Sequence, residues 1–274
     1  MQPPKKSIYT NLAILLIRGS VVFLFLFIAY SFYGRAIGFA LGERSIILSF
    51  IAIWLFTAYF FLPRMHRFLS KLYLPNYYIG RTHSKDGLLA DPVNLALNAT
   101  EDSLVQAMER AGWKTADPIT LRTSLRIIKA SLLKQSYPHA PISSLVLFGR
   151  SQDIAFQKEV RGNPRARHHV RFWQTPPDWF LPGGYKSDWL GAATFDKSVG
   201  FSLFTGQITH KIDAETDRER NHLIDTLKNI NALEKIRIVE HFTTAYHHRN
   251  SGGDSIRTDG SMPFITLRNE SGWT

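Results

Sequence analysis

The stretch RARHHVRFW, residues 165–173, alternates in a way that decides how the surrounding chain folds. Successive side chains of a β-strand point to opposite faces of the sheet. One face of this strand would carry Arg167, His169, Arg171 and Trp173, and the other would carry His168, Val170 and Phe172. The pattern therefore predicts a strand with one apolar face directed at a core and one cationic face exposed to solvent.

The segments on either side of this strand predict an α+β fold. Strand patterns occupy residues 91–99, 143–150, 153–159, 234–242 and 264–269. Residues 188–204 read as a hairpin that turns near Asp196–Ser198. Thr100 is suited to cap a helix over residues 101–111, a second helix fits residues 121–135, and Asp213 is suited to cap a third. Strands dominate the middle and helices flank them, so we expect a mainly antiparallel sheet with flanking helices.

The first 62 residues have a different character and predict a transmembrane helical hairpin. Two long apolar runs, at about 12–33 and 45–62, approach the roughly 20 residues that a membrane-spanning helix needs. Residues 63–80 read as a juxtamembrane connector broken at Pro75, and residues 81–274 as the soluble domain. A signal peptide would have one shorter apolar core and a cleavage site. We therefore expect an integral membrane protein with two spans.

Basic residues close to the spans predict the orientation of the hairpin. Lys5, Lys6 and Arg18 precede or begin the first span, and Arg64, Arg67 and Lys71 follow the second. The connecting loop carries Arg35 and Arg44, partly offset by Glu43. Because cytoplasmic flanks are enriched in Lys and Arg, both termini and the soluble domain are predicted to be cytoplasmic.

The overall composition excludes some classes of function and favours others. The 274 residues carry a net charge of +11 and no cysteine. Disulfides, thiolate catalysis and zinc–thiolate sites are therefore excluded. The basic excess favours phosphates or anionic lipids as neighbours. Nucleic acid is not an expected partner, because the basic residues are scattered and form no known binding motif.

Seven blocks occur in an order that resembles the LssY C-terminal domain family. They are DPVNLALNA (91–99), AGWKTADPITLRTS (111–124), LVLFGRSQDIAFQKEV (145–160), RARHHVRFW (165–173), WLGAATFDKSVG (189–200), THKIDAETDRERN (209–221) and GGDSIRTDG (252–260). The resemblance covers about Pro75 to Gly260. It implies a bacterial inner (cytoplasmic) membrane location, with no established activity. In other members the domain follows a membrane phosphatase domain of the PAP2 type, which suggests a membrane phosphatase as a partner. One departure is Lys211, where many relatives have a second histidine.

Two predicted sites follow from the alternation. His168 and His210 would both point inward; with Asp213, or with Asp153 or Asp196, they would form the catalytic group of a metal-assisted phosphoesterase. The residue spacing identifies no particular metal or cofactor. Alternatively, each histidine is a core residue with a backbone or carboxylate partner.

The cationic face predicts a different activity. Arg165, Arg167, His169 and Arg171 would bind a phosphorylated or otherwise anionic ligand, because guanidinium groups suit bidentate contact with phosphate. Acidic residues on adjoining strands would instead neutralise this row as cross-strand pairs. We favour a membrane-tethered accessory or binding domain of the cell envelope that recognises an anionic ligand. The alternatives are the hydrolase and a purely structural scaffold.

Overall fold

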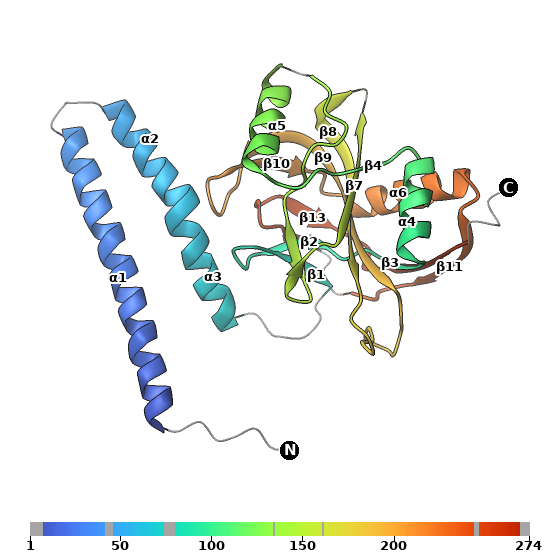
Figure 1. The fold of residues 1–274 in the computed structure, drawn as a ribbon, viewed down its shortest axis with the longest axis horizontal. Coiled ribbons are helices and arrows are strands. Elements are labelled where there is room, and N and C mark those ends of the chain that lie inside the picture. The colour runs from blue at the N-terminus through green and yellow to red at the C-terminus, as the bar shows by residue number, and fades with distance from the viewer. Residues whose placement is uncertain are drawn as a thin grey trace. The chain divides into compact units, whose positions relative to one another are not determined.

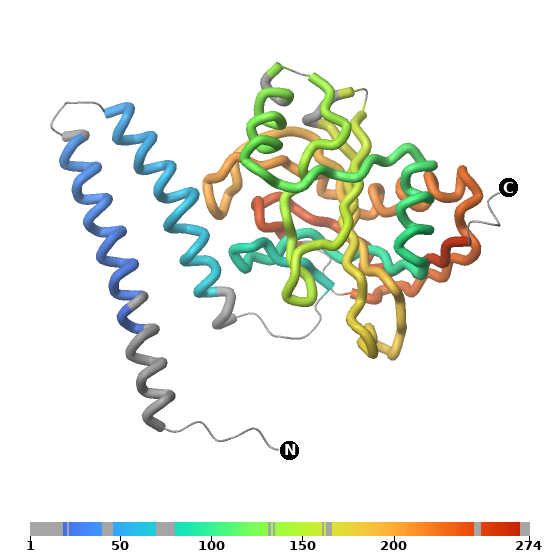
Figure 2. The backbone as a smooth tube through the Cα atoms, viewed as in Figure 1, coloured from blue at the N-terminus to red at the C-terminus, as the bar shows by residue number. Residues whose placement is uncertain are grey.

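The computed structural model describes residues 8–41, 46–73, 80–133, 135–160, 162–243 and 247–268 (Figure 2). The chain divides into two compact units, Met1–Pro63 and Arg64–Thr274.

The first unit is helical. It contains α1 (Ile8–Leu41), α2 (Ile46–Phe56) and a π-helical turn η1 (Thr57–Phe61), and α3 (Leu62–Tyr73) continues from it into the second unit. Two helices are long and apolar enough to cross a membrane, over Val22–Phe39 and Ile46–Leu69. The predicted break at Pro75 lies outside the described residues.

In the second unit, the described chain forms one large sheet and two small ones (Figure 1). The large sheet has the order β11 (Leu233–Val239), β14 (Met262–Leu267), β3 (Leu95–Asn98), β9 (Trp189–Phe201), β8 (Asn163–Gln174), β7 (Ile154–Val160) and β4 (Lys114–Thr115), and β10 (Ile208–Ile212) pairs with β9. The small sheets are β2 (Leu89–Pro92), β1 (Arg81–Ser84), β5 (Leu145–Leu147), β6 (Arg150–Ser151), and the ribbon β12 (His247–Arg249), β13 (Ser255–Arg257). The β3–β14 pair is parallel, and the other strand pairs of the large sheet are antiparallel. The predicted α+β class is confirmed.

Three helices accompany these sheets: α4 (Glu101–Arg110), α5 (Leu121–Leu133) and α6 (Thr216–Asn229). The Thr100 side chain caps α4 as expected, because its hydroxyl accepts a hydrogen bond from the backbone N–H of Ser103 at 3.2 Å. Asp213 does not cap α6. Its carboxylate instead accepts from the backbone N–H of Glu215 at 2.9 Å, and the helix begins one residue later.

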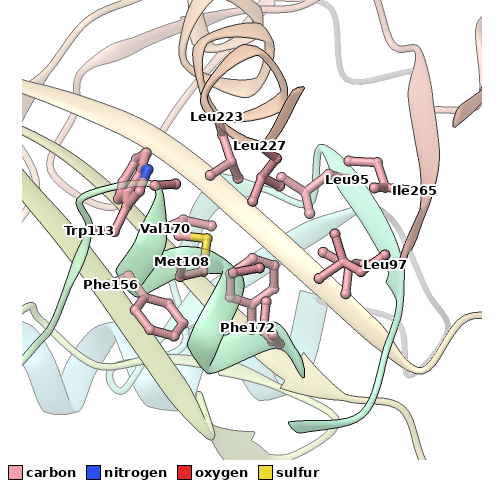
Figure 3. Close-up of a cluster of buried hydrophobic side chains, with 14 of the residues drawn as sticks. Leu95, Leu97, Met108, Trp113, Phe156, Val170, Phe172, Leu223, Leu227 and Ile265 are labelled. Carbon is pink, nitrogen blue, oxygen red and sulfur yellow. The ribbon is translucent and has the colours of Figure 1, made fainter. Parts of the chain in front are cut away.

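The two faces of the large sheet pack against two different hydrophobic cores. Leu95, Leu97, Val170 and Phe172 face α4 and α6 in the first core (Figure 3). Alternate residues of the same strands, such as Trp173, face a second core with β5 of the small sheet. The alternation predicted for residues 167–173 is therefore correct, and Arg167, His169 and Arg171 share the face that carries Trp173.

The predicted hairpin turn near Asp196–Ser198 is wrong. Strand β9 runs without interruption from Trp189 to Phe201, and the turn to β10 lies at residues 202–207. Asp196 resembles a turn residue in the sequence, but in the fold it stands opposite Arg167 on β8. An oppositely charged residue on the neighbouring strand stabilises a carboxylate inside a strand. The sequence alone did not show that Arg167 would be this partner.

Gly191 on β9 provides a test of the first core. A Cβ atom at this position would lie 2.6 Å from Leu95 Cδ1 and 3.0 Å from Phe172 Cε1. We expect Gly191→Ala to lower the free energy of unfolding by about 1–3 kcal/mol, because a packed core does not accept an added methyl group. Gly200→Ala on the same strand is the control, since its nearest neighbour is the flexible Lys211 side chain. Equal stabilities of the two variants in urea unfolding would contradict this packing.

Candidate anion-binding site

A polar cavity of about 170 Å³ lies on the face of the large sheet that points away from α4 and α6. Strands β2, β8, β9 and β10 and the loop after β12 supply its walls. Its polar lining includes Asp91, Ser143, Arg167, His169, Arg171, Asp196, Thr209, His210 and Asn250. Three of the four predicted ligand-binding residues and one of the two predicted catalytic histidines therefore meet here.

The predicted exposure of the cationic face is wrong. Arg167 and His169 are each 2% exposed, and Arg171 is 3% exposed. Arginine is almost never fully buried unless it is paired. The alternative prediction, that acidic residues on adjoining strands neutralise these cations, agrees better with the structure. Asp196 of β9 and Asp91 of β2 lie against the cationic face.

Arg167 is held by its neighbours on both sides in the sheet. Its Nε donates to Asp196 Oδ2 at 3.1 Å, and its Nη2 lies 3.0 Å from the same oxygen. Its Nη1 donates to the side-chain carbonyl of Gln157 on β7 at 2.8 Å. Both partners are buried, so the guanidinium is fixed by strand register.

Arg171 is held from the smaller sheet and the loop before β5. Its Nη1 donates to Asp91 Oδ2 at 3.0 Å, and two further nitrogens donate to the backbone and side-chain oxygens of Ser143 at 3.0 Å. Burial lowers the pKa of Arg171 from its usual value, while the charge of Asp91 opposes that shift. An arginine remains protonated under these conditions.

His169 connects the two ion pairs. Its Nε2 lies 2.6 Å from the hydroxyl of Thr194, which in turn donates to Asp91 Oδ2 at 3.4 Å. Since that hydroxyl proton goes to Asp91, the Nε2–H of His169 donates to the hydroxyl oxygen. Its Nδ1 lies 3.3 Å from Asp196 Oδ1. Burial opposes ionisation of Asp196, but the charges of His169 and Arg167 outweigh it and lower its pKa.

His210 also lines the cavity, and no ion pair involving its side chain is formed with the described residues. The Nε2 atom is buried and has no hydrogen-bond partner among the described residues. Burial lowers the pKa of His210 to about 4, although the charge of Asp196 acts in the opposite direction. The ring is therefore neutral near pH 7, and His210 is among the residues that line the cavity.

The predicted catalytic residues are not brought together. His168 lies on the opposite face of the sheet, where its Nδ1 is 2.7 Å from Glu219 Oε2 and its ring stacks on His222. Asp213 does not line the cavity. Asp153 pairs with Arg150, and only Asp196 of the proposed acids accompanies His210. Within the described ranges, no group of three or more His, Asp or Glu residues is arranged to hold a metal ion.

The remaining predicted ligand-binding residue, Arg165, has a side chain outside the described part of the structure. The sequence did not identify Asp91 and Asn250, which line the cavity, or Thr194, which contacts both His169 and Asp91. Asn250 donates to Asp91 Oδ1 at 3.3 Å across 159 residues of chain. Only Asp91 could have been singled out from the sequence, because it is an acidic residue at the start of an apolar strand pattern and is followed by a proline.

Among the described residues, the network leaves hydrogen-bonding capacity on residues that line the cavity. A guanidinium carries five N–H groups. Three of them on Arg167 and three on Arg171 are used in the contacts described above, which leaves two on each residue. With His210 Nε2, these groups are suited to bind the oxygens of an anion.

Comparison with known proteins supports the resemblance. The model of the family described as LssY C-terminus matches residues 71–262, a range that includes the whole cavity. No curated protein and no solved structure matches the chain. Since the family model covers more than half of the chain, this protein belongs to the LssY C-terminus family.

Proposed function

We propose that this protein is a membrane-tethered binding domain whose polar cavity takes a phosphate-bearing ligand. The observation that carries the proposal is the convergence of Arg167, Arg171 and His210 on one cavity, each with hydrogen-bonding capacity that protein groups leave unused. Buried arginines cost desolvation energy, and a scaffold gains little from them. An anion-binding site would account for the burial of Arg167 and Arg171.

The size and depth of the cavity favour a small group over a large ligand. Pockets for drug-sized molecules usually measure roughly 300–1,000 Å³. A cavity of about 170 Å³ suits a phosphate or a similar headgroup. Bidentate contact from two fixed guanidinium groups favours the tetrahedral phosphate oxygens over a single carboxylate.

The proposed location follows from the N-terminal helices. We propose that the two apolar helices span the inner membrane of a bacterium and that both termini and the binding domain lie in the cytoplasm. The ligand would then be an anionic lipid or a phosphorylated small molecule, and a separate membrane phosphatase is the proposed partner. The two candidate spans support this topology, as do the basic residues Arg64 and Arg67, which follow the uncharged run 45–62.

The test is a calorimetric titration of inorganic phosphate into the full chain in uncharged detergent micelles at pH 7, for wild type and His210→Phe. We expect the variant to bind phosphate about 10- to 100-fold more weakly, because a hydrogen bond to a charged group contributes about 1.5–3 kcal/mol. Its stability should stay unchanged or rise, because the substitution removes a buried nitrogen without a partner.

Arg257→Ala serves as the matched control for loss of a basic residue. Arg257 is 63% exposed in its side chain and pairs with Glu215 away from the cavity. The Arg257→Ala variant should bind phosphate with the same affinity as the wild type. If wild type and His210→Phe bind phosphate equally, or if neither binds it, the cavity is not the proposed site.

One observation favours a second function, the hydrolysis of a phosphoester in the same cavity. A neutral His210 beside a carboxylate is suited to act as a general base. Slow release of phosphate from a phosphomonoester by wild type, absent in His210→Phe, would make the domain an enzyme. His168 would have no part in that reaction, because it lies on the opposite face of the sheet.

A further inference from the structure

Large apolar side chains are exposed in two segments of the unit Arg64–Thr274. The first segment comprises α5 and the residues before it, and the second is the tip of the β9–β10 hairpin. The exposed side chains are Ile119, Leu121, Leu125, Ile128 and Leu133 in the first segment, and Val199, Phe201, Leu203, Phe204 and Ile208 in the second. Elsewhere in the described part of this unit, Phe68, Phe180 and Ile238 are the other exposed large apolar residues. Concentrated apolar exposure of this kind marks an interaction surface.

The exposed residues of α5 form a stripe at helical spacing. Leu121, Leu125 and Ile128 follow one another at i, i+4 and i+7, and they are 79%, 58% and 55% exposed. Ala130, on the opposite side of the helix, is buried against Tyr137. The stripe is therefore not the face with which α5 attaches to its own domain.

Charges beside this stripe are all positive. Arg122 and Lys129 are exposed beside the apolar stripe, Arg126 lies over the ring of Tyr137 at 4.1 Å, and no acidic residue occurs between 118 and 135. An exposed apolar stripe bordered by basic residues is typical of a helix that lies in the interface of an anionic membrane. The charge of the segment thus complements phospholipid headgroups.

The two segments both supply residues to a second cavity, which adjoins the polar cavity and which we take as its entrance. This second cavity, of about 250 Å³, is lined by Ile119, from the first segment, and by Ser202 and Thr205, from the hairpin tip. It shares Ser143, Leu145, Thr209, Ser251 and Gly252 with the polar cavity. A molecule that approaches the arginines through the second cavity therefore passes between the two apolar segments.

The chain also confines this unit to the neighbourhood of a bilayer. The second candidate span ends at Leu69 and β1 begins at Arg81, so the connection extends at most about 40 Å when fully stretched. Within the unit, His66 Nε2 donates to the carbonyl oxygen of Phe204 at 2.9 Å. The hairpin tip is thus in contact with α3.

We propose that these two apolar segments form a membrane-docking surface, and that the polar cavity takes its phosphate from the headgroup of an anionic phospholipid in the bilayer. The docking surface consists of Ile119, Leu121, Leu125, Ile128, Phe201, Leu203 and Ile208. The ligand class rests on the function proposed above, whereas the docking surface stands on exposure and charge. Docking places the cavity entrance against the headgroups, so the phosphate enters without the lipid leaving the membrane.

The absence of cysteine from the chain makes a direct test possible. Leu125→Cys and Leu203→Cys, introduced singly into the full chain, are spin-labelled in nanodiscs of phosphatidylcholine with one quarter phosphatidic acid. We expect both labels to collide at least threefold more with lipid-soluble oxygen than with a water-soluble nickel complex. A label at Asp225→Cys on α6, 65% exposed in its side chain and outside the docking surface, should show the reverse.

The outcomes separate this inference from the function on which it rests. Labels at 125 and 203 that are as water-accessible as the label at 225 overturn the docking surface, even if phosphate binds in detergent. Strong dipolar broadening between labels of two chains overturns it in favour of a second copy. Lipid-exposed labels without phosphate binding support the docking surface and show that the proposed phosphate-binding function is wrong. Lipid-exposed labels together with weaker binding of phosphatidic acid by His210→Phe support the whole proposal.

Discussion

Asp196→Ala should lower the free energy of unfolding by about 3–5 kcal/mol, the cost of removing one partner from a buried ion pair. Asp196 is 2% exposed and faces both Arg167 and His169, at 3.0 Å and 3.3 Å. Without the carboxylate, Arg167 keeps only Gln157 as a described side-chain partner. Urea unfolding of the full chain in detergent, followed by tryptophan fluorescence, measures the loss.

Asp225→Ala is the matched control for Asp196→Ala. Asp225 pairs with Lys228 at 3.4 Å on the exposed side of α6, and exposed pairs of this kind contribute about 0–1 kcal/mol. A loss of equal size in both variants would contradict the burial of the Asp196 network. A much larger loss for Asp196→Ala confirms that the strand register of β8 and β9 depends on this pair.

The contribution of Asp196 also has a predicted pH dependence. The folded protein lowers the pKa of this carboxyl below its unfolded value, which is about 4. Unfolding therefore takes up a proton as the pH falls below 4, and the stabilisation is complete only above that pH. The difference in stability between wild type and Asp196→Ala should stay constant from pH 7 to pH 5 and shrink below pH 4.

Arg171→Met should also cost about 3–5 kcal/mol, because it leaves the carboxylate of Asp91 buried without its cation. Adding Asp91→Asn should restore most of that loss, since Asn carries no charge and its one amide oxygen, in the place of Oδ1, still accepts from Asn250. Replacement of a whole buried ion pair by neutral groups is often close to neutral for stability. Urea unfolding of the two single variants and the double variant measures this recovery.

The double variant separates a structural role from a binding role. If the Arg171–Asp91 pair serves only to hold the fold, the stable double variant should lose nothing else. If the arginine serves a ligand, the double variant should be folded and unable to bind phosphate. A double variant no more stable than Arg171→Met would show that the pair is needed for the fold itself.

The alternation of a single strand predicted which residues share the cavity wall. Arg167, His169 and Arg171 were assigned to one face and His168 to the other, and both assignments are correct. Their burial could not be predicted, because it depends on partners that are distant in the sequence. Asp91 lies 80 residues before Arg171, and its strand belongs to another sheet.

His210 shows the same limit from the other direction. The sequence predicted that His210 points inward, yet its strand neighbour Ile208 is 57% exposed and His210 lines a polar cavity. The strand is short and lies at the edge of the sheet beside β9, where the burial of one residue does not follow from its neighbours. A helix over 121–135 was predicted from its pattern and is observed over Leu121–Leu133, but the exposure of its leucines depends on how little of the domain covers it.

The most direct test of the binding function is the titration of inorganic phosphate into the full chain, in uncharged detergent at pH 7, for wild type and the Asp91→Asn/Arg171→Met double variant. The account predicts saturable binding by wild type and at least tenfold weaker binding by a double variant that unfolds at a similar urea concentration. Equal affinities in the two folded proteins would contradict it, because Arg171 would then make no contribution to phosphate binding.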